Sequence, residues 1–172
     1  LGFGGALRRS EIVKIDVEHV RFTAEDAEVG ARVNLGRTKA DQHGKSDDQP
    51  IYYAVHDRSL CPIAALRAWL DASKITTGPI FRAVDRHGIV RDRLSGHDVA
   101  VIIKRLVGDA GLDAHHFSGH SLRAGFITEA YLRKRPEHEI TEHTRHSPRS
   151  NTVRDYFRTV DRWRHNAARG LL

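Results

Sequence analysis

Two segments in the first quarter of the sequence carry charged side chains at spacings that suit work on a phosphoryl group. Arg8 and Glu11 are three residues apart, so on a helix they share one face and the carboxylate can orient the guanidinium. Lys39 lies in a polar stretch where a lysine can reach a substrate and donate a proton. Taken alone, each feature is also typical of an ordinary solvated surface, so the spacing by itself does not decide between the two interpretations.

A third segment, Ser118-Gly-His-Ser-Leu-Arg-Ala-Gly125, combines an imidazole with a guanidinium. His120 and Arg123 are again three residues apart and are expected to point the same way. Arginine neutralises phosphate oxygens and histidine can donate or accept a proton, so the pair is suited to phosphate binding. Gly119 and Gly125 predict that another part of the backbone approaches closely here.

The fourth segment pairs a second imidazole with a possible nucleophile. His146 follows Arg145, and Tyr156 comes ten residues later. A phenol can attack phosphorus if neighbouring cations favour the phenolate. Tyr156 also falls on the apolar side of its expected helix, so in isolation a core tyrosine remains the alternative.

The elements expected around these residues define an α+β chain that is mainly helical. A short helix is expected at residues 5–14 and strands at 17–23, 31–35 and 51–55, with a hairpin tip at 39–49. Apolar spacing predicts helices at 63–70, 99–107, 119–134, 137–145 and 153–163. Ser95 and Asp98 predict a capping box before the second of these, and Gly111 predicts its end. The strands predict one small antiparallel sheet near the N-terminus.

Composition points to a polyanionic partner. The chain has 172 residues, a formal net charge of +6 and a pI of about 9.8. Residues 144–169 hold seven arginines against two aspartates, and Arg154, Arg158 and Arg162 share a helix face. This stripe suits phosphates, although a solvated helix face is the common alternative.

Other sequence features exclude or constrain further classes. Cys61 is the single cysteine, so no intrachain disulfide can form, and no apolar run is long enough to span a membrane. The apolar opening without a methionine indicates that the chain is part of a longer protein.

The four segments together resemble the catalytic domain of tyrosine recombinases, the phage integrase family. The resemblance runs from about residue 2 to the C-terminus. Its most specific parts are Gly119-His-Ser-Leu-Arg-Ala-Gly125 and Thr144-Arg-His146 followed by Tyr156. It implies the catalytic-domain fold over residues 1–172, with the family's N-terminal core-binding domain absent from this chain. Since the family usually has nine residues from the last histidine to the nucleophile, the extra residue is expected in the loop at 147–151.

The resemblance also implies a mechanism and its residues. Tyr156 would attack a DNA phosphate to form a 3′-phosphotyrosyl link, without a metal ion or other cofactor. The implied catalytic set is Arg8, Lys39, His120, Arg123, His146 and Tyr156, with Glu11 orienting Arg8. Further phosphate contacts on DNA are expected from Arg9, Arg37, Lys45, Arg145, Arg154 and Arg158.

The resemblance further implies double-stranded DNA as partner, a homotetramer assembled on DNA, and a cytoplasmic location at the bacterial nucleoid. Three alternatives stay open from the residues alone. They are a DNA-binding fragment that does not cut, a type IB topoisomerase-like relaxing activity, and a metal site among His138, His143 and His146 and the glutamates beside them. The spacing of those histidines matches no standard metal site.

Overall fold

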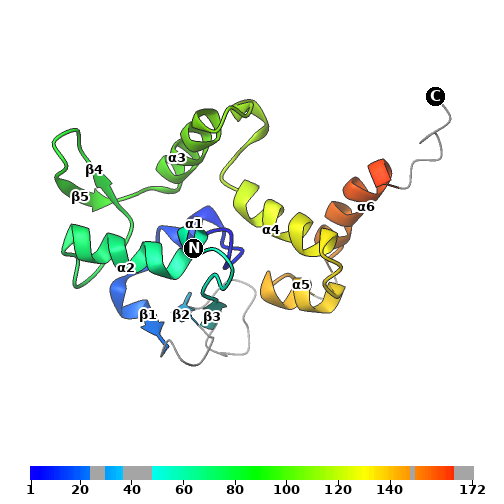
Figure 1. The fold of residues 1–172 in the computed structure, drawn as a ribbon, viewed down its shortest axis with the longest axis horizontal. Helices are drawn as coiled ribbons and strands as arrows, with labels where there is room; N and C mark the ends of the chain where they lie inside the picture. Colours follow the sequence, from blue (N-terminus) through cyan, green and yellow to red (C-terminus); the bar gives the residue numbers. More distant parts are fainter. Residues whose placement is uncertain (24–29, 37–47, 148–149, 165–172) are drawn as a thin grey trace.

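The chain was analysed as a computed structural model, which describes residues 1–23, 30–36, 48–147 and 150–164, with side chains up to Arg162 (Figure 1). Lys39, Arg37 and Lys45 lie outside the described residues, as does most of the expected hairpin tip. None of the described helices is both long and apolar enough to cross a membrane.

A three-stranded antiparallel sheet lies near the N-terminus, as the sequence predicts. It has the order β1 (Val20–Phe22), β2 (Ala31–Asn34) and β3 (Asp48–Ile51). Ala31 is the Cα partner of both Phe22 and Ile51. Residues 17–19 form a 3-10 helix rather than the start of β1.

The predicted strand at 51–55 is wrong in its position, because β3 ends at Ile51 and residues 52–55 follow it without strand pairing. The end of the expected hairpin tip, Asp48-Gln49, belongs to this strand instead. Pro50 faces Arg32 in the ladder, and a proline is tolerated there because β3 is an edge strand.

A second sheet was not predicted. β4 (Arg82–Val84) and β5 (Val90–Arg93) form an antiparallel hairpin with a register shift. The hairpin projects from the side of the molecule next to α2 and α3 (Figure 1).

Six α-helices supply most of the remaining regular structure in the described residues. The first helix is much shorter than predicted, whereas the other five agree with the apolar spacing to within a few residues at either end. Their bounds are α1 (Arg9–Ile12), α2 (Pro62–Ser73), α3 (Gly96–Asp109), α4 (Ser121–Leu132), α5 (Glu137–His143) and α6 (Thr152–Arg164).

The capping box expected before α3 is present. The Ser95 hydroxyl accepts from the Asp98 amide at 3.2 Å, and the Asp98 carboxylate accepts from the Ser95 amide at 2.7 Å. Gly111 has a φ of +76°, which suits a glycine just after a helix end.

Two apolar cores hold these elements together. The larger core joins α1, the first sheet, α2 and α3, and includes Leu7, Val33 and Ile63, all fully buried. The smaller core consists of Ile127, Ile140 and Val153, from α4, α5 and α6. These three helices form a group on the side of the molecule away from the β4–β5 hairpin (Figure 1). The predicted nucleophile lies in this group, so the small core determines where it sits.

Candidate active site

Arg8 is oriented by Glu11, as the sequence predicts. Nη1 of Arg8 donates to Oε1 of Glu11 at 2.5 Å, and the Arg8 backbone N–H donates to Oε2 at 2.7 Å. Arg8 is the residue immediately before α1, and Glu11 is the third residue of the helix, so the carboxylate also caps the helix N-terminus. The Arg8 side chain remains 36% exposed, which leaves it free to meet a ligand.

The ionised form of Glu11 is favoured. Burial raises the pKa of its carboxyl, but the Arg8 backbone N–H and the charges of Arg145 and Arg8 outweigh burial, so the pKa lies below its usual value. Glu11 therefore remains an anion that can hold Arg8 and Arg145 at once.

Arg123 is buried on the first turn of α4, with only 5% exposure. Its Nη1 donates to the Ala6 carbonyl oxygen at 2.7 Å, and its Nη2 donates to the Thr144 carbonyl oxygen. Burial, together with the positive charges of Arg8 and Arg145, lowers the pKa of Arg123 to about 10. The guanidinium is thus still protonated near neutral pH, in a place that already contains two other arginines. Such a concentration of positive charge favours an anionic ligand.

His146 lies against Arg123, with 3.3 Å between Nε2 of the histidine and Nη2 of the arginine. Its Nδ1 is 2.8 Å from the Thr144 hydroxyl oxygen. That hydroxyl also donates to the Ile140 carbonyl at 2.7 Å. Nη2 of Arg123 is nearly equidistant from the two ring nitrogens, at 3.3 Å from Nε2 and 3.4 Å from Nδ1. Burial and the charges of Arg123, Arg8 and Arg145 lower the pKa of His146 to about 4.

Tyr156 packs on the small core through its ring, from the second turn of α6. It is half-buried, and a phenolate at this position would raise the pKa of Arg123 through its charge. Tyr156 can therefore pack on the small core and still lie close enough to Arg123 for its charge to act on that guanidinium. The interval from His146 to Tyr156 starts in the connection after α5, which ends at His143, and ends within α6, which starts at Thr152. The extra residue expected at 147–151 stays a prediction.

The other tyrosines have different surroundings. The Tyr131 hydroxyl donates to the Asp161 carboxylate at 2.8 Å, and its ring stacks on Phe157. Tyr52 is 60% exposed at the pocket described below.

The structure places His120 and Arg123 in different environments. His120 is exposed just before α4, whereas Arg123 is buried. The expected close approach at the two glycines involves side chains rather than backbone. A Cβ on Gly119 would lie 2.5 Å from Cδ of Arg9, and one on Gly125 would lie 3.6 Å from the Phe3 ring. Arg9 therefore lies across Gly119 with its side chain exposed.

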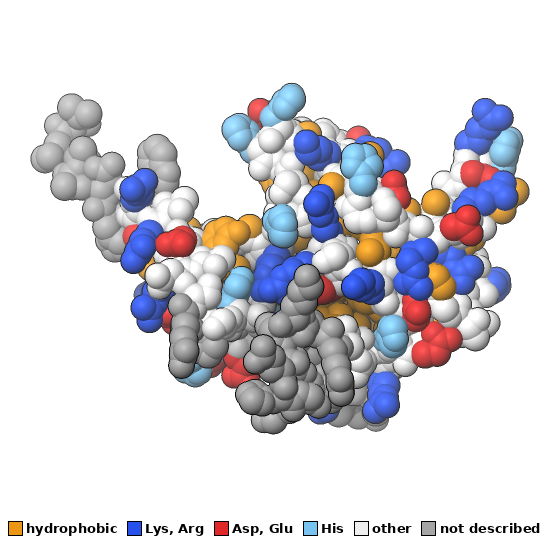
Figure 2. Space-filling view, turned by 180° about the vertical axis from the view of Figure 1, so that it is seen from behind, with side chains coloured by type: hydrophobic (Ala, Val, Ile, Leu, Met, Phe, Trp, Pro, Cys, Tyr) orange, Lys and Arg blue, Asp and Glu red, His pale blue; other side chains and the backbone are white. Residues whose placement is uncertain are grey.

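Arg154 and Arg158 are exposed on α6, as expected for a basic face. Arg154 donates to Glu137 at 2.7 Å and Arg158 to Asp155 at 3.2 Å. Exposed pairs of this kind contribute about 0–1 kcal/mol each, so a phosphate can replace the carboxylate at little cost. Figure 2 shows Lys, Arg and His side chains over a broad face of the molecule, with a group of Lys and Arg near its middle.

Three residues with a place in this site had no predicted role in phosphate binding. Thr144, fully buried, contacts both Arg123 and His146. Gln49 on β3 accepts from Arg145, and His143 lies 2.9 Å from the Gly4 carbonyl oxygen through its Nε2. Thr144 and Arg145 stood beside His146 in the sequence, but nothing in the spacing linked Gln49 to them.

The histidines that suggested a metal site have other partners. His143 stacks on Phe126, and His146 contacts Arg123 and Thr144. Among the residues that the structure describes, no three His, Cys, Asp or Glu side chains are arranged to hold a metal ion.

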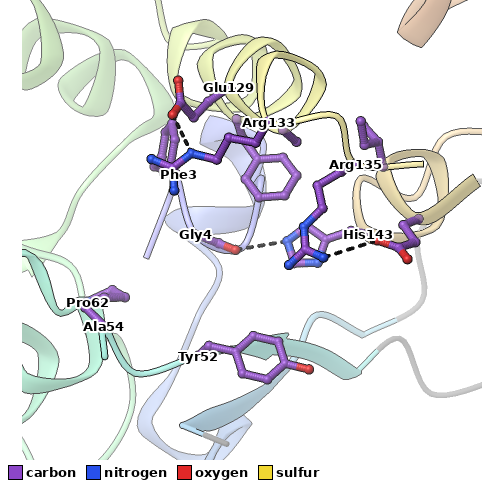
Figure 3. A pocket seen from close by; sticks show the side chains of 13 residues that line it. Phe3, Gly4, Tyr52, Ala54, Pro62, Glu129, Arg133, Arg135 and His143 are labelled. Atoms are coloured by element: carbon purple, nitrogen blue, oxygen red, sulfur yellow. Dashed lines mark hydrogen bonds and ion pairs between the residues drawn. The ribbon is translucent and has the colours of Figure 1, made fainter. Parts of the chain in front are cut away.

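A separate cavity of about 570 Å³ lies between the N-terminal segment, α4 and α5 (Figure 3). Phe3, Tyr52 and His143 line it, and the Arg133–Glu129 ion pair lies at its edge. Neither Arg123 nor Tyr156 lines this cavity.

Comparison with known proteins identifies the family. The family model of the phage integrase family matches residues 1–162, and the chain belongs to this family. The chain is 43% identical over 147 residues to an integrase/recombinase xerD homolog from Selenomonas ruminantium, a match that covers 85% of this chain and 42% of the relative. It therefore spans less than half the length of that relative.

Two solved structures share the fold. The crystal structure of XerA recombinase is similar with a TM-score of 0.59 at 16% identity, over 96% of this chain and 54% of that one. The Tn1549 transposon integrase in complex with transposon right end DNA has a TM-score of 0.54 at 13% identity. This match covers 99% of this chain and 57% of that one. The fold is thus that of tyrosine recombinases, as the sequence predicted.

Proposed function

We propose that this chain is the catalytic part of a site-specific DNA recombinase that cuts and rejoins strands through Tyr156. The phenolate oxygen attacks a backbone phosphorus, the bond to the 5′ oxygen breaks, and a 3′-phosphotyrosyl link forms. A 5′ hydroxyl then attacks this link and releases the tyrosine. The phosphodiester energy is kept in the covalent intermediate, so rejoining needs no other energy source.

The observation that carries this proposal is the contact of Arg123 with His146, close enough to Arg8 and Tyr156 for charges on those two side chains to act on it. Arg8 and Arg123 supply guanidinium groups for the non-bridging oxygens, where negative charge concentrates in the transition state. His146 donates a ring N–H to the same phosphate.

The two remaining members of the catalytic set are assigned by resemblance. Lys39 protonates the departing 5′ oxygen, and His120 binds the phosphate or accepts the tyrosine proton. The exposure of His120 beside α4 is consistent with contact to a ligand that arrives from outside.

The partner in this proposal is double-stranded DNA, bound by a homotetramer at the nucleoid of the bacterial cytoplasm. Flanking phosphates are bound by Arg9, Arg37, Lys45, Arg154 and Arg158 without reading sequence. The net charge of +6 and the exposed arginines of α6 support such binding.

The test is covalent capture on nicked duplexes of randomised sequence, which prevent rejoining after cleavage. Tyr156→Phe should bind DNA as the wild type does but form no adduct on a denaturing gel. Tyr52→Phe is the matched control, because this exposed tyrosine lies outside the cluster and should leave adduct formation unchanged. An adduct that persists in Tyr156→Phe, or that maps by peptide mass to another tyrosine, contradicts the assignment.

A further inference from the structure

Arg145 has a backbone conformation that rarely suits an arginine. Its φ is +53°, in the left-handed region that glycine adopts most easily. The Arg145 amide donates to the Glu142 carbonyl and the His146 amide to the Thr141 carbonyl, at 2.9 and 3.1 Å. This pair of bonds is the Schellman ending of α5, in which glycine is the usual residue at the position of Arg145. The turn itself therefore does not favour arginine, and glycine can replace it without backbone strain.

The Arg145 side chain joins three parts of the site. Its Nη2 lies 2.8 Å from Oε2 of Glu11, the carboxylate that holds Arg8. Its Nη1 donates to Oε1 of Gln49, which is buried on β3. Its own backbone precedes His146 directly. One guanidinium therefore connects the orienting residue of Arg8, the edge strand of the sheet and the turn that carries His146.

Burial shows that this guanidinium is poorly placed to be an outer DNA contact. The side chains of Arg145 and Glu11 are 11% and 10% exposed, in contrast to 60% for Arg154. A buried ion pair is costly to break because each charge loses its partner away from water. The phosphate contact expected for Arg145 from the sequence would require breaking this pair.

We propose that Arg145 is a positioning residue of the cleavage reaction, which fixes Arg8 through Glu11 and fixes β3 and the His146 turn relative to it. This inference rests on the proposed function, because it concerns the same phosphate site. Arg145 itself does not touch the reacting phosphate.

The decisive variant is Arg145→Gly, because glycine suits the positive φ and removes only the side chain. Covalent capture on randomised nicked duplexes should slow by about 100-fold, the size of effect that a small misplacement of catalytic groups produces. DNA affinity and its dependence on salt should stay close to the wild-type values. A phosphate ligand would behave differently, since its loss weakens binding and lowers the salt slope by about 1.

Lys134→Gly is the matched control. Lys134 has a φ of +59°, and the amides of Lys134 and Arg135 close α4 with the same pair of bonds, to Tyr131 and Ala130. The substitution removes one positive charge and relaxes the same backbone position, away from the arginine cluster. Its adduct formation should equal that of the wild type.

Each result decides the question. A wild-type rate for Arg145→Gly overturns the proposal, as does a loss of DNA affinity with a lower salt slope. If Arg145→Gly fails to fold, Arg145→Lys takes its place; this variant keeps the charge but cannot make both bonds, and a wild-type rate from it overturns the proposal.

A failure of the proposed function would be recognised separately, because the wild type would then form no adduct. In that case NMR of the free protein decides, since Arg145→Gly should move the side-chain signals of Arg8 and His146 and Lys134→Gly should not. Unmoved signals in Arg145→Gly would overturn the positioning role.

Discussion

Arg123 and His146 are held together by a single residue, Thr144. The Thr144 carbonyl accepts from the guanidinium of Arg123, and its hydroxyl fixes Nδ1 of His146 at 2.8 Å. Nη2 of Arg123 lies 3.3 Å from Nε2 and 3.4 Å from Nδ1 of the same ring, so the guanidinium and the imidazole are in direct contact. The two groups that the proposed reaction requires at one phosphate are therefore already adjacent in the free protein, which reduces the cost of organising them in the transition state.

The first prediction concerns Arg123→Lys. A lysine retains the positive charge but cannot bond the Ala6 and Thr144 carbonyls while also contacting a phosphate. Adduct formation should fall by about 100-fold or more, as when one preorganised donor is removed from a transition state. Single-turnover capture on nicked duplexes measures the rate.

Arg105→Lys is the control for this change, because Arg105 is exposed on α3 outside the cluster. It should retain the wild-type rate. Equal rates for Arg123→Lys and the wild type would show that Arg123 does not bind the reacting phosphate.

The second prediction concerns pH and stability. The pKa of His146 is lowered to about 4 in the folded protein, whereas in the unfolded chain it lies near the ordinary value of about 6.5. Between these values the unfolded chain binds more protons, so the free energy of unfolding falls as the pH drops from about 7 toward 4. His143, whose pKa is also lowered by burial, acts in the same direction.

His146→Gln should therefore lose less stability between pH 7 and pH 5 than the wild type does, measured by urea unfolding. His115→Gln, a change at an exposed histidine, is the control and should follow the wild-type curve. If His146→Gln also follows that curve, the histidine is not buried against the arginines in solution.

The helices were predictable from the sequence because their apolar spacing agrees with their burial. Val99 and Ile103 are buried on α3, and Ser95 caps the start of that helix, as the sequence indicated. The β4–β5 hairpin was missed because its strands carry arginines and mostly exposed side chains, so no apolar alternation marks them. β3 was misplaced for a similar reason, since Asp48-Gln49-Pro50 resembles a turn and pairs through its backbone.

Part of the site was predictable from the motifs. Arg8 with Glu11 follows from local spacing, and Arg123, His146 and Tyr156 follow from the resemblance. The links between distant segments could not be predicted, because Gln49 and Arg145 are 96 residues apart in the chain. The sequence placed Arg145 among the DNA contacts because charge alone does not distinguish an exposed arginine from one that is paired inside the fold.

The third prediction concerns Gly30, at the start of β2. Its φ is +119°, and a Cβ there would lie 2.0 Å from the Ile51 carbonyl oxygen. Gly30→Ala should therefore destabilise the first sheet by about 1–3 kcal/mol from backbone strain, with a further cost from the contact with backbone. Chemical denaturation measures the loss.

Gly36→Ala separates strain from collision, because Gly36 has a φ of +68° and open space around the Cβ position. It should cost about 1–2 kcal/mol, the ordinary penalty for a left-handed residue with a side chain. Equal losses for the two variants would mean that the approach of Ile51 to Gly30 is not as close as described.

The last prediction connects the small core to the chemistry. Ile127, on α4, is fully buried and belongs to the cluster against which Tyr156 packs. Ile127→Ala should cost about 2–5 kcal/mol of stability, from lost burial and the cavity left behind. Because the same cavity loosens the support of Tyr156, adduct formation should also slow at temperatures where the variant is folded.

Ile103→Ala, in the larger core, separates these effects, since it removes the same atoms from a buried site that does not contact α6. Both variants should unfold at lower denaturant concentrations, but only Ile127→Ala should slow capture of the nicked duplex. If both slow it equally, the small core contributes general stability and does not specifically place the nucleophile.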